Sequence, residues 1–298
     1  MIQDAGPISA LTRVPAWSLT VASMLAAQLG AALSVGLFPV IGTAGSAWLR
    51  LTFGALMFVA LVRPRLSAWT WRELQTPALL GVVSGIMTLV FLAAIDRLPL
   101  GTTVAIDFLG PLTVAVALSH SRRALVWPVL ALVGVIALTQ PCFGGIDPIG
   151  IGFALLSAIS WGTYILLTQR VGDRFTGVDG LAISMPVAAL TAGVVGIPQA
   201  WGHLTGAVVM QSLGIAVLMP VLAFGLEMLA LKRLTASSFG TLMALEPAIG
   251  VLVGAVVLAQ IPDGVQILGV ALVVAAGIGA ERIGHRGSGP ARFEAHAG

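Results

Sequence analysis

Ten apolar runs follow one another along the sequence and leave little room for anything else. About 20 apolar residues in a helix are enough to cross the hydrocarbon core of a bilayer, which is roughly 30 Å thick. The pattern predicts an all-α polytopic membrane protein. Its ten transmembrane helices are expected over residues 17–38, 45–62, 77–95, 101–119, 124–140, 149–169, 180–198, 211–231, 236–259 and 265–280.

The composition excludes several other classes. Hydrophobic residues make up 58% of the chain and charged residues only 9%, whereas a soluble domain carries about 25% charged residues. The net charge is +3 and the basic residues are spread over short loops, which argues against a nucleic-acid partner. Cys142 is the only cysteine, and no run has a histidine at its centre. The sequence therefore predicts no internal disulfide, no metal site and no cofactor.

Two stretches of the sequence, 136 residues apart, repeat one pattern. They read RLPLGTTVAIDFLGPLTVAVALSHSR (97–122) and RLTASSFGTLMALEPAIGVLVGAVVLAQ (233–260). The offset superposes Pro111 on Pro247, and each copy holds an acid within its apolar run, Asp107 in the first and Glu246 in the second. Interrupted, acid-bearing membrane helices in corresponding halves are typical of a transporter whose binding site lies between two repeats.

Lysine and arginine are distributed unevenly between the two sides of the predicted membrane region. Of the 15, 13 lie in the N-terminal segment, in alternate loops and in the C-terminal tail. The opposite loops hold only Arg97, and the remaining one, Arg50, lies within a run. Because positive residues favour the cytoplasmic side, we expect both termini to face the cytoplasm.

Five runs in each half is an odd number, so the second half must be inverted relative to the first. The sequence thus predicts two inverted five-helix repeats, residues 16–141 and 148–281. A cytoplasmic segment, residues 1–15, precedes them. The tail, residues 282–298, is rich in Gly, Arg and His and is expected to be disordered.

Four ionisable side chains lie within the runs: Arg50, Asp107, Glu227 and Glu246. A charge at the centre of a bilayer costs at least ~2.5 kcal/mol, and such residues usually belong to substrate or ion pathways. Arg50 and Asp107 lie at similar depths, which leaves open a binding site or an ion pair that locks two helices together. Glu227 either faces the site or reaches the interface near the basic pair at residues 232–233.

Glu246 has no further intramembrane cation to neutralise it. It must carry a proton, contact water in a cavity, or bind a cationic group. Gly250 and Gly254 follow on the same helix face, where they either open space beside the acid or allow close helix packing. The proline of each repeat cannot donate to the carbonyl four residues before it. It therefore either frees an acceptor near the acid or simply kinks the helix.

Three uncharged side chains near the middle of runs complete the candidate site. Gln28 needs a hydrogen-bond partner in a membrane interior. Trp161 and Tyr164 lie away from the interfaces where aromatic residues usually anchor membrane helices. Two interpretations are open for this aromatic pair, a position on the wall of a cavity and ordinary packing in the core.

Four motifs carry a resemblance to a known family: WLRLTFG around Arg50, LGTTVAIDFLGPLTVAV (100–116), GLEMLALKRL (225–234) and FGTLMALEPA (239–248). On these motifs the chain resembles the EamA-type transporters of the drug/metabolite transporter superfamily. The resemblance implies ten spans in two inverted five-helix repeats and a location in a bacterial inner membrane. It also implies efflux of small amino acids such as threonine or homoserine, or of related metabolites. Efflux of drugs or other metabolites is the alternative within the superfamily.

The expected mechanism is proton antiport by alternating access, with Glu246 holding either a proton or the ammonium of the substrate. The chain contains neither HExxH nor GxSxG, and no segment outside the runs is large enough for a signalling domain. We therefore expect neither an enzyme nor a receptor. The expected partners are an amino-acid-like small molecule and membrane lipids. The oligomeric state stays open, a monomer being one alternative.

Overall fold

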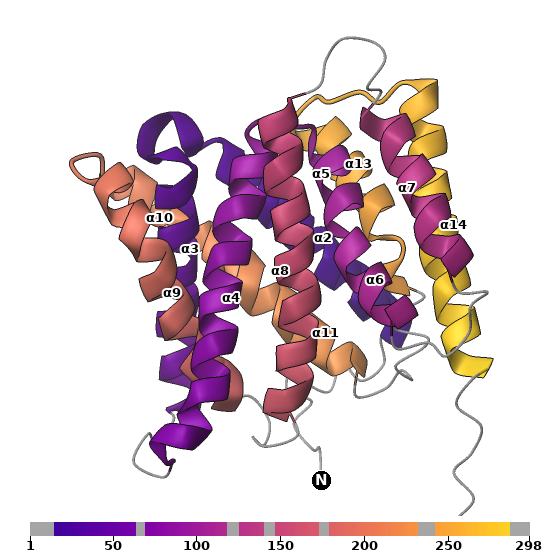
Figure 1. Ribbon diagram of the computed structural model, residues 1–298. Coiled ribbons are helices and arrows are strands. Elements are labelled where there is room, and N and C mark those ends of the chain that lie inside the picture. The colour runs from indigo at the N-terminus through magenta and orange to yellow at the C-terminus, as the bar shows by residue number, and fades with distance from the viewer. Residues whose placement is uncertain are drawn as a thin grey trace, which may run out of the picture.

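The computed structural model describes residues 15–63, 69–117, 125–139, 147–172, 179–231 and 242–286, and the regular structure in these residues is helical throughout. Six of the described helices are long and apolar enough to cross a membrane, and four further apolar helices are shorter. The helices pack side by side as a bundle (Figure 1). The prediction of an all-helical fold is confirmed.

In the first half of the chain, local signals explain where helices begin. A capping box opens α4, because the side chains of Thr70 and Glu73 bond each other's backbone N–H groups. A proline lies in the first turn of α3, where its missing N–H costs nothing. The described segments are α2 (Ala16–Val35), α3 (Phe38–Val62), α4 (Trp71–Ile95), α5 (Leu100–Asp107), α6 (Leu109–Ala117) and α7 (Val126–Thr139).

The second half begins with a capped helix. The Oδ1 atom of Asp147 accepts hydrogen bonds from the backbone N–H groups of Ile149 and Gly150, which the first turn of a helix leaves unpaired. The described segments are α8 (Pro148–Gly172), α9 (Asp179–Ala200), α10 (Gly206–Ala216), a short π-helical segment η4 (Val217–Leu222), α11 (Ala223–Leu231), α13 (Glu246–Val257) and α14 (Gly264–Arg286).

Prolines interrupt three of the predicted spans. The fourth divides into α5 and α6 directly after Asp107, because Pro111 cannot donate to the carbonyl of Asp107. In the ninth, a helix begins at Glu246 instead of running through it, with Pro247 in its first turn. Residues 236–241 of that predicted span lie outside the described residues. The eighth contains the π-helical segment around Pro220.

The predicted ends of three other spans are also wrong by several residues. The first helix ends at Val35 instead of residue 38, because a turn of two residues suffices to start α3 at Phe38. The second span therefore starts before residue 45 and contains a break at Gly42, where φ is +69°. The third starts at Trp71 instead of residue 77, so that Pro77 lies inside the helix.

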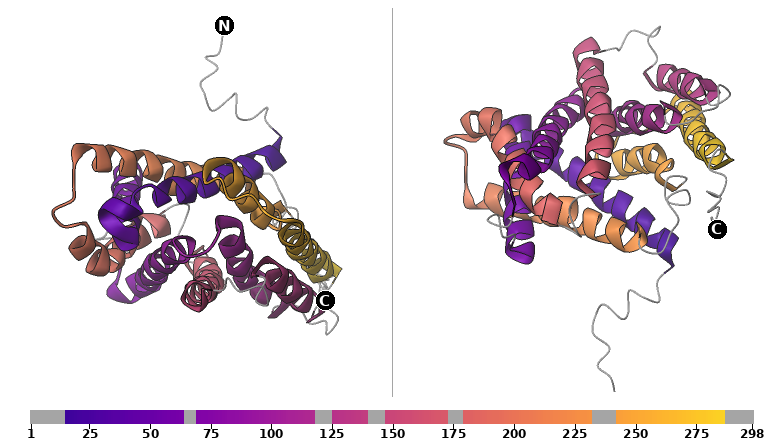
Figure 2. Two further views of the ribbon diagram at one scale, coloured as in Figure 1. Left: turned by 90° about the horizontal axis from the view of Figure 1, so that it is seen from above. Right: turned by 60° about the horizontal axis from the view of Figure 1, so that its bottom comes forward.

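The two halves of the chain pack against each other through matched pairs of helices. α3 lies along α9, α5 along α13, and α7 along α14. In the same way α2 lies along α11 and α4 along α8, and the two further views of Figure 2 let the reader follow these pairs. Each pair joins a helix from before residue 141 to one from after residue 147, so the interior of the bundle is shared by both halves.

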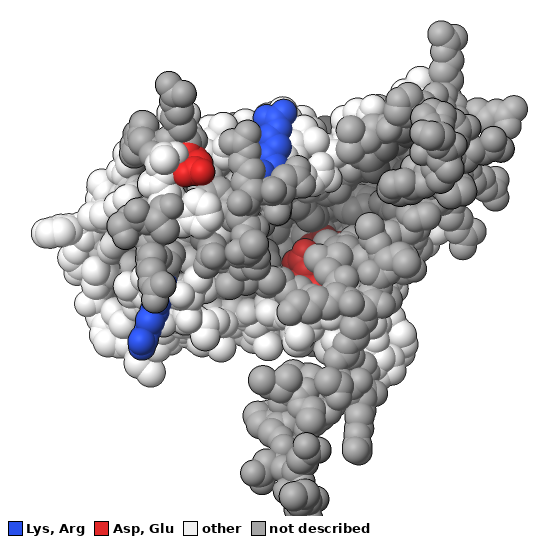
Figure 3. Space-filling model, turned by 90° about the horizontal axis from the view of Figure 1, so that it is seen from below, with Lys and Arg blue, Asp and Glu red and all other residues white. Residues whose placement is uncertain are grey.

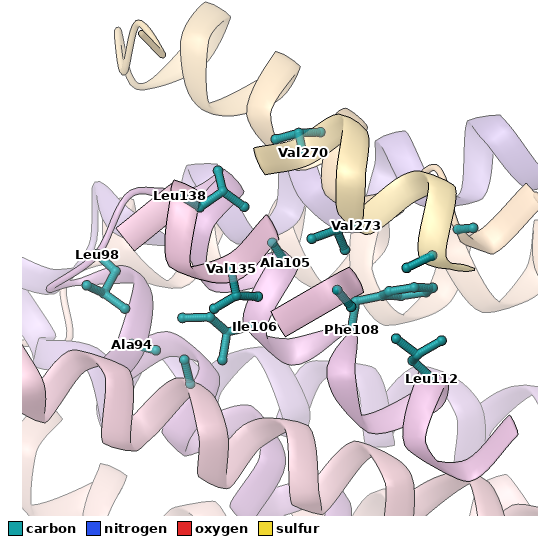
Figure 4. Close-up of a cluster of buried hydrophobic side chains, with 14 of the residues drawn as sticks. Ala94, Leu98, Ala105, Ile106, Phe108, Leu112, Val135, Leu138, Val270 and Val273 are labelled. Carbon is teal, nitrogen blue, oxygen red and sulfur yellow. The ribbon is translucent and has the colours of Figure 1, made fainter. Parts of the chain in front are cut away.

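Apolar side chains fill the interior and also cover the outside. One buried cluster gathers Phe108, Val135 and Val273 from α5–α6, α7 and α14 (Figure 4). On the outer surface, Leu61 is 77% exposed and Val194 is 75% exposed. A large apolar surface of this kind marks contact with a membrane or a partner, and together with the six long apolar helices it fits a protein surrounded by lipid.

Candidate substrate-binding cavity

A cavity of about 160 Å³ lies inside the bundle. Its wall is built by α2, α3, α4 and α5 of the first half and by α8, η4, α11 and α13 of the second. All seven residues that the sequence nominates for the site lie on this wall: Gln28, Arg50, Asp107, Trp161, Tyr164, Glu227 and Glu246. The fold thus brings together candidates that are spread over more than 200 residues of sequence.

The two carboxyl oxygens of Glu246 differ, because one accepts a hydrogen bond from a described side chain and the other does not. It is the first residue of α13 and is buried. Its Oε1 atom accepts a hydrogen bond from Nε2 of Gln28, at 3.2 Å. Its Oε2 atom is buried and has no hydrogen-bond partner among the described residues. A buried carboxyl oxygen without a partner is unusual, and here it lies on a cavity wall, where a donor from a bound molecule can reach it.

Asp107 supplies a second acid from the other half of the chain. It is the last residue of α5, it is buried, and the hydroxyl of Ser157 on α8 lies close to it. Its Oδ1 atom has no hydrogen-bond partner in the described part of the chain. A bound molecule can therefore donate to this oxygen from the cavity.

Arg50 is the only basic side chain on the described wall, and it is 4% exposed. An ion pair joins Arg97 to Asp147, whereas the described side chains of Arg50 and Asp107 form no ion pair with each other. The interpretation of these two residues as a helix-locking ion pair is therefore wrong. Depth along a helix does not determine which way a side chain points. The Nε atom of Arg50 has no hydrogen-bond partner in the residues that the structure describes, so the guanidinium can bind a carboxylate from a bound molecule.

The remaining candidates lie between the cavity and the core. Glu227 on α11 lines the cavity, which favours the interpretation in which it faces the site. Its alternative partners, residues 232–233, lie outside the described residues. Trp161 lines the cavity and packs against the cluster around Phe108, while Tyr164 lines it and packs beside Leu80. For the two aromatic residues, both interpretations made from the sequence therefore apply together.

The glycines near the site serve close packing. A Cβ atom added to Gly250 would lie 3.1 Å from the Cβ atom of Val104, so α13 rests directly on α5. A Cβ atom added to Gly110 would collide with the backbone carbonyl of Ala158, so α6 rests directly on α8. The packing interpretation of the glycine stripe after Glu246 is the one that these contacts favour.

Several wall residues carried no signal in the sequence. Serine and threonine are hard to recognise because their hydroxyls readily bond to backbone carbonyls within helices. Ser23 Oγ instead donates across to another helix, to the carbonyl of Ala223 at the start of α11. Methionine and phenylalanine resemble ordinary core residues. The residues missed in this way are Ser23, Met24, Met87, Thr88, Phe91, Met219, Phe224 and Met243.

An ion pair joins the two halves at the upper end of the bundle in Figure 1. Arg97, in the turn after α4, donates from Nη1 to Oδ2 of Asp147, before α8, at 2.8 Å. The hydrogen bond from Arg97, with further ones from the backbone of Gly150 and Ile149, holds the pKa of the Asp147 carboxyl below its usual range. Asp147 is therefore ionised at neutral pH.

Two glutamines of the second half bind helix ends of the first half at the same end of the bundle. Gln199 Oε1 accepts from the N–H groups of Ala44 and Gly45, at 2.7 and 3.1 Å. Gln260 Oε1 accepts from the N–H group of Leu100, the first residue of α5, at 2.9 Å. The lower end of the bundle has a recess near its middle. Acidic atoms lie within this recess, as the view from below in Figure 3 shows.

A helical membrane bundle whose polar cavity lies between two halves of the chain has the architecture of a membrane transport protein. The sequence comparisons specify the class further. The model of the EamA-like transporter family matches residues 148–279, and relatives match both halves. The chain belongs to the EamA-like transporter family.

Two of these relatives are bacterial exporters. The threonine/homoserine exporter RhtA of Salmonella typhimurium strain LT2 is 36% identical over 280 residues, which are 90% of this chain and 92% of the relative. RhtA of Escherichia coli strain K12 is 36% identical over 282 residues, 90% of this chain and 93% of the relative. The predictions of an EamA-type transporter, of a multi-pass membrane protein and of a transporter instead of an enzyme are confirmed.

A solved crystal structure has the same fold. It superposes with a TM-score of 0.62, covers 90% of this chain and 98% of its own, and is 18% identical in sequence.

Proposed function

We propose that this chain is an inner-membrane exporter of small amino acids of the threonine and homoserine type. The observation that carries the proposal is one buried cavity that presents Arg50 together with unpartnered carboxyl oxygens of Asp107 and Glu246. A zwitterionic amino acid complements such a wall, because its carboxylate pairs with a guanidinium and its ammonium with a carboxylate. The names of the relatives at 36% identity agree with this substrate class.

The size of the cavity favours an amino acid over a drug. Pockets that bury drug-sized ligands measure about 300–1,000 Å³, whereas this cavity measures about 160 Å³. The hydroxyls of Ser23 and Thr88 also lie on its wall, where they suit a substrate with a polar side chain. Multidrug efflux is the alternative that transport measurements must exclude.

The proposed topology is ten spans in two inverted repeats, residues 16–141 and 148–281, with short segments before and after. The match of the family model to residues 148–279 supports a repeat of that size, and so do the matched helix pairs. The start of α2 and the end of α14 both lie at the lower end of Figure 1. Since the basic residues favour a cytoplasmic location for both termini, the lower end is assigned to the cytoplasm.

A cysteine introduced at either end tests this orientation in a Cys142→Ala background. His203, in the turn after α9, is exposed at the upper end, and Trp17, at the start of α2, is 57% exposed at the lower end. An impermeant thiol reagent added outside should label His203→Cys and not Trp17→Cys. The reverse pattern would invert the topology.

The proposed coupling is competition at Glu246. In an inverted-repeat transporter, the halves rock so that one site opens to each side in turn. With its Oε1 atom held by Gln28, the carboxyl of Glu246 has one oxygen left, and this oxygen takes either a proton or the ammonium of the substrate. A proton that enters from outside would release the amino acid there. The contacts at the upper end, including Arg97 with Asp147, would then break once in each cycle.

Exchange of radiolabelled threonine across proteoliposomes tests the proposed function. Vesicles with the protein should exchange internal labelled threonine for external threonine or homoserine, and protein-free vesicles should not. Arg50→Gln should slow exchange by at least tenfold, because the carboxylate loses its charged partner. If no amino acid moves while an organic cation drug does, the multidrug alternative replaces this proposal.

A further inference from the structure

Methionine is concentrated around the cavity. Four of the nine methionines of the chain lie on its wall, and each comes from a different part of the bundle. They are Met24 of α2, Met87 of α4, Met219 of η4 and Met243, three residues before α13. Phe91 and Phe224 complete the apolar part of the wall. We refer to the four methionines as the methionine wall.

Three members of the methionine wall are not fully buried. Met24 is only 2% exposed, whereas Met87, Met219 and Met243 are partly exposed. Methionine is unbranched, rotates about three bonds and fills irregular gaps, and it is common on surfaces that bind many different ligands. The backbone of Met219 also leaves the helical conformation, with φ −140° and ψ 119°.

The polar groups of the cavity, in contrast to the methionines, are fixed by a hydrogen bond or by burial. Glu246 is tied to Gln28 by a hydrogen bond, and Arg50 is only 4% exposed on the long helix α3. These groups would hold the ammonium and the carboxylate, which all amino acids share. The methionine wall would face the side chain, which differs from one amino acid to another.

We propose that the methionine wall lets this transporter carry amino acids with larger apolar side chains, such as leucine and methionine, in addition to small hydroxy amino acids. The proposal rests on the proposed function. A rigid apolar pocket separates substrates that differ by one methylene by about 10–200-fold. A wall that repacks loses much of that discrimination, as Met-rich promiscuous binding surfaces do.

Competition against labelled threonine exchange in proteoliposomes tests the inference. In the wild-type protein, unlabelled leucine should compete within tenfold of unlabelled threonine. In the double variant Met87→Ile/Met243→Ile, the strength of competition by leucine relative to threonine should fall at least tenfold. Isoleucine is close to methionine in size, but its branched side chain is stiff at χ1. The variant therefore removes adaptability and leaves the volume of the wall nearly unchanged.

Met185→Ile is the matched control, because Met185 is 4% exposed in the core between α3 and α9, away from the cavity. It should leave both competitions unchanged. If wild-type protein exchanges threonine but leucine competes more than 100-fold more weakly, the inference is wrong and the proposed function stands. If leucine competes equally well with the wild type and the double variant, the methionines do not set the range. If the wild type exchanges no amino acid, the proposed function itself fails.

Should the double variant lose threonine exchange as well, the single variants Met87→Ile and Met243→Ile decide the question. The ratio of leucine to threonine competition must fall in at least one of them. An unchanged ratio in both overturns the inference.

Discussion

The two proline breaks occupy the same place in the two halves of the chain, yet they position their acids differently. In the first break, Asp107 lies four residues before the proline and Gly110 directly before it. In the second, Met243 lies four residues before the proline and Glu246 directly before it. Asp107, Met243 and Glu246 all line the cavity, whereas Gly110 packs against α8.

Neighbouring helices explain this difference. At Gly110 a Cβ atom would collide with the backbone of Ala158, which leaves no space for an acidic side chain. At Glu246 the neighbour is Gln28, which donates a hydrogen bond. The two prolines thus determine where each helix breaks, and the packing of each half determines which position can carry a charge. The result is a cavity with two unlike acids in place of a symmetric pair.

The largest effect on stability is expected where packing excludes a side chain. Gly110→Ala should lower the free energy of unfolding by about 1–3 kcal/mol or more, because the obstacle is backbone and cannot move aside easily. The control is Gly152→Ala on α8, where an added Cβ atom meets nothing within 4 Å. Thermal unfolding in detergent compares the two. Equal melting temperatures would mean that the contact between α6 and α8 is looser than described.

The second largest effect is expected on the affinity for threonine. Asp107→Asn should weaken threonine binding by about 10–100-fold, in line with the roughly 1.5–3 kcal/mol of a hydrogen bond to a charged group. It should change the melting temperature little, because Asp107 has no ion-pair partner among the described residues. Isothermal titration with threonine measures the affinity. A large loss of stability at unchanged affinity would make Asp107 a structural residue.

The sequence predicts those features of the structure that depend on local chemistry, and it does not predict those that depend on how helices pack. Apolar runs, the repeat and the two prolines depend on local chemistry, so the helical fold and the breaks near Asp107 and Glu246 were predictable. The lack of pairing between Arg50 and Asp107 was not, because it depends on how two helices are rotated about their axes. The methionine wall was not predictable either, because methionine has no spacing that separates a cavity wall from a core.

A smaller effect on substrate affinity is expected at Gln28, which donates a hydrogen bond to Glu246. Gln28→Leu removes the hydrogen bond to Oε1 of Glu246, and a typical hydrogen bond contributes about 0.5–1.5 kcal/mol. The concentration of threonine for half-maximal exchange should rise about two- to tenfold. Gln211→Leu, at an exposed position of α10, is the control and should leave exchange unchanged. Equal effects in both variants would show that Gln28 does not orient Glu246.

The smallest effect should lie outside both breaks, at the ion pair of Arg97 with Asp147. Because the pKa of Asp147 is held below its usual range, the pair persists above the ordinary aspartate value of about 4. It is lost only as the pH falls through the lowered value. Between about pH 5 and 8, the pH profile of exchange should thus be the same for Asp147→Asn and wild-type protein. If the pH profile of exchange is flat in Asp147→Asn and not in wild-type protein, Asp147 at the upper end couples proton and substrate, and the proposed role of Glu246 is wrong.

Accumulation of threonine under a pH gradient tests most directly whether Glu246 couples proton and substrate. Wild-type vesicles should concentrate labelled threonine when the gradient is imposed. Glu246→Gln vesicles should not, although the protein is folded, because the amide is neutral and nearly isosteric with the acid. Asp107→Asn vesicles should still respond to the gradient at raised threonine concentration. If Glu246→Gln vesicles concentrate threonine at the wild-type rate, Glu246 is a packing residue and the proposed coupling is wrong.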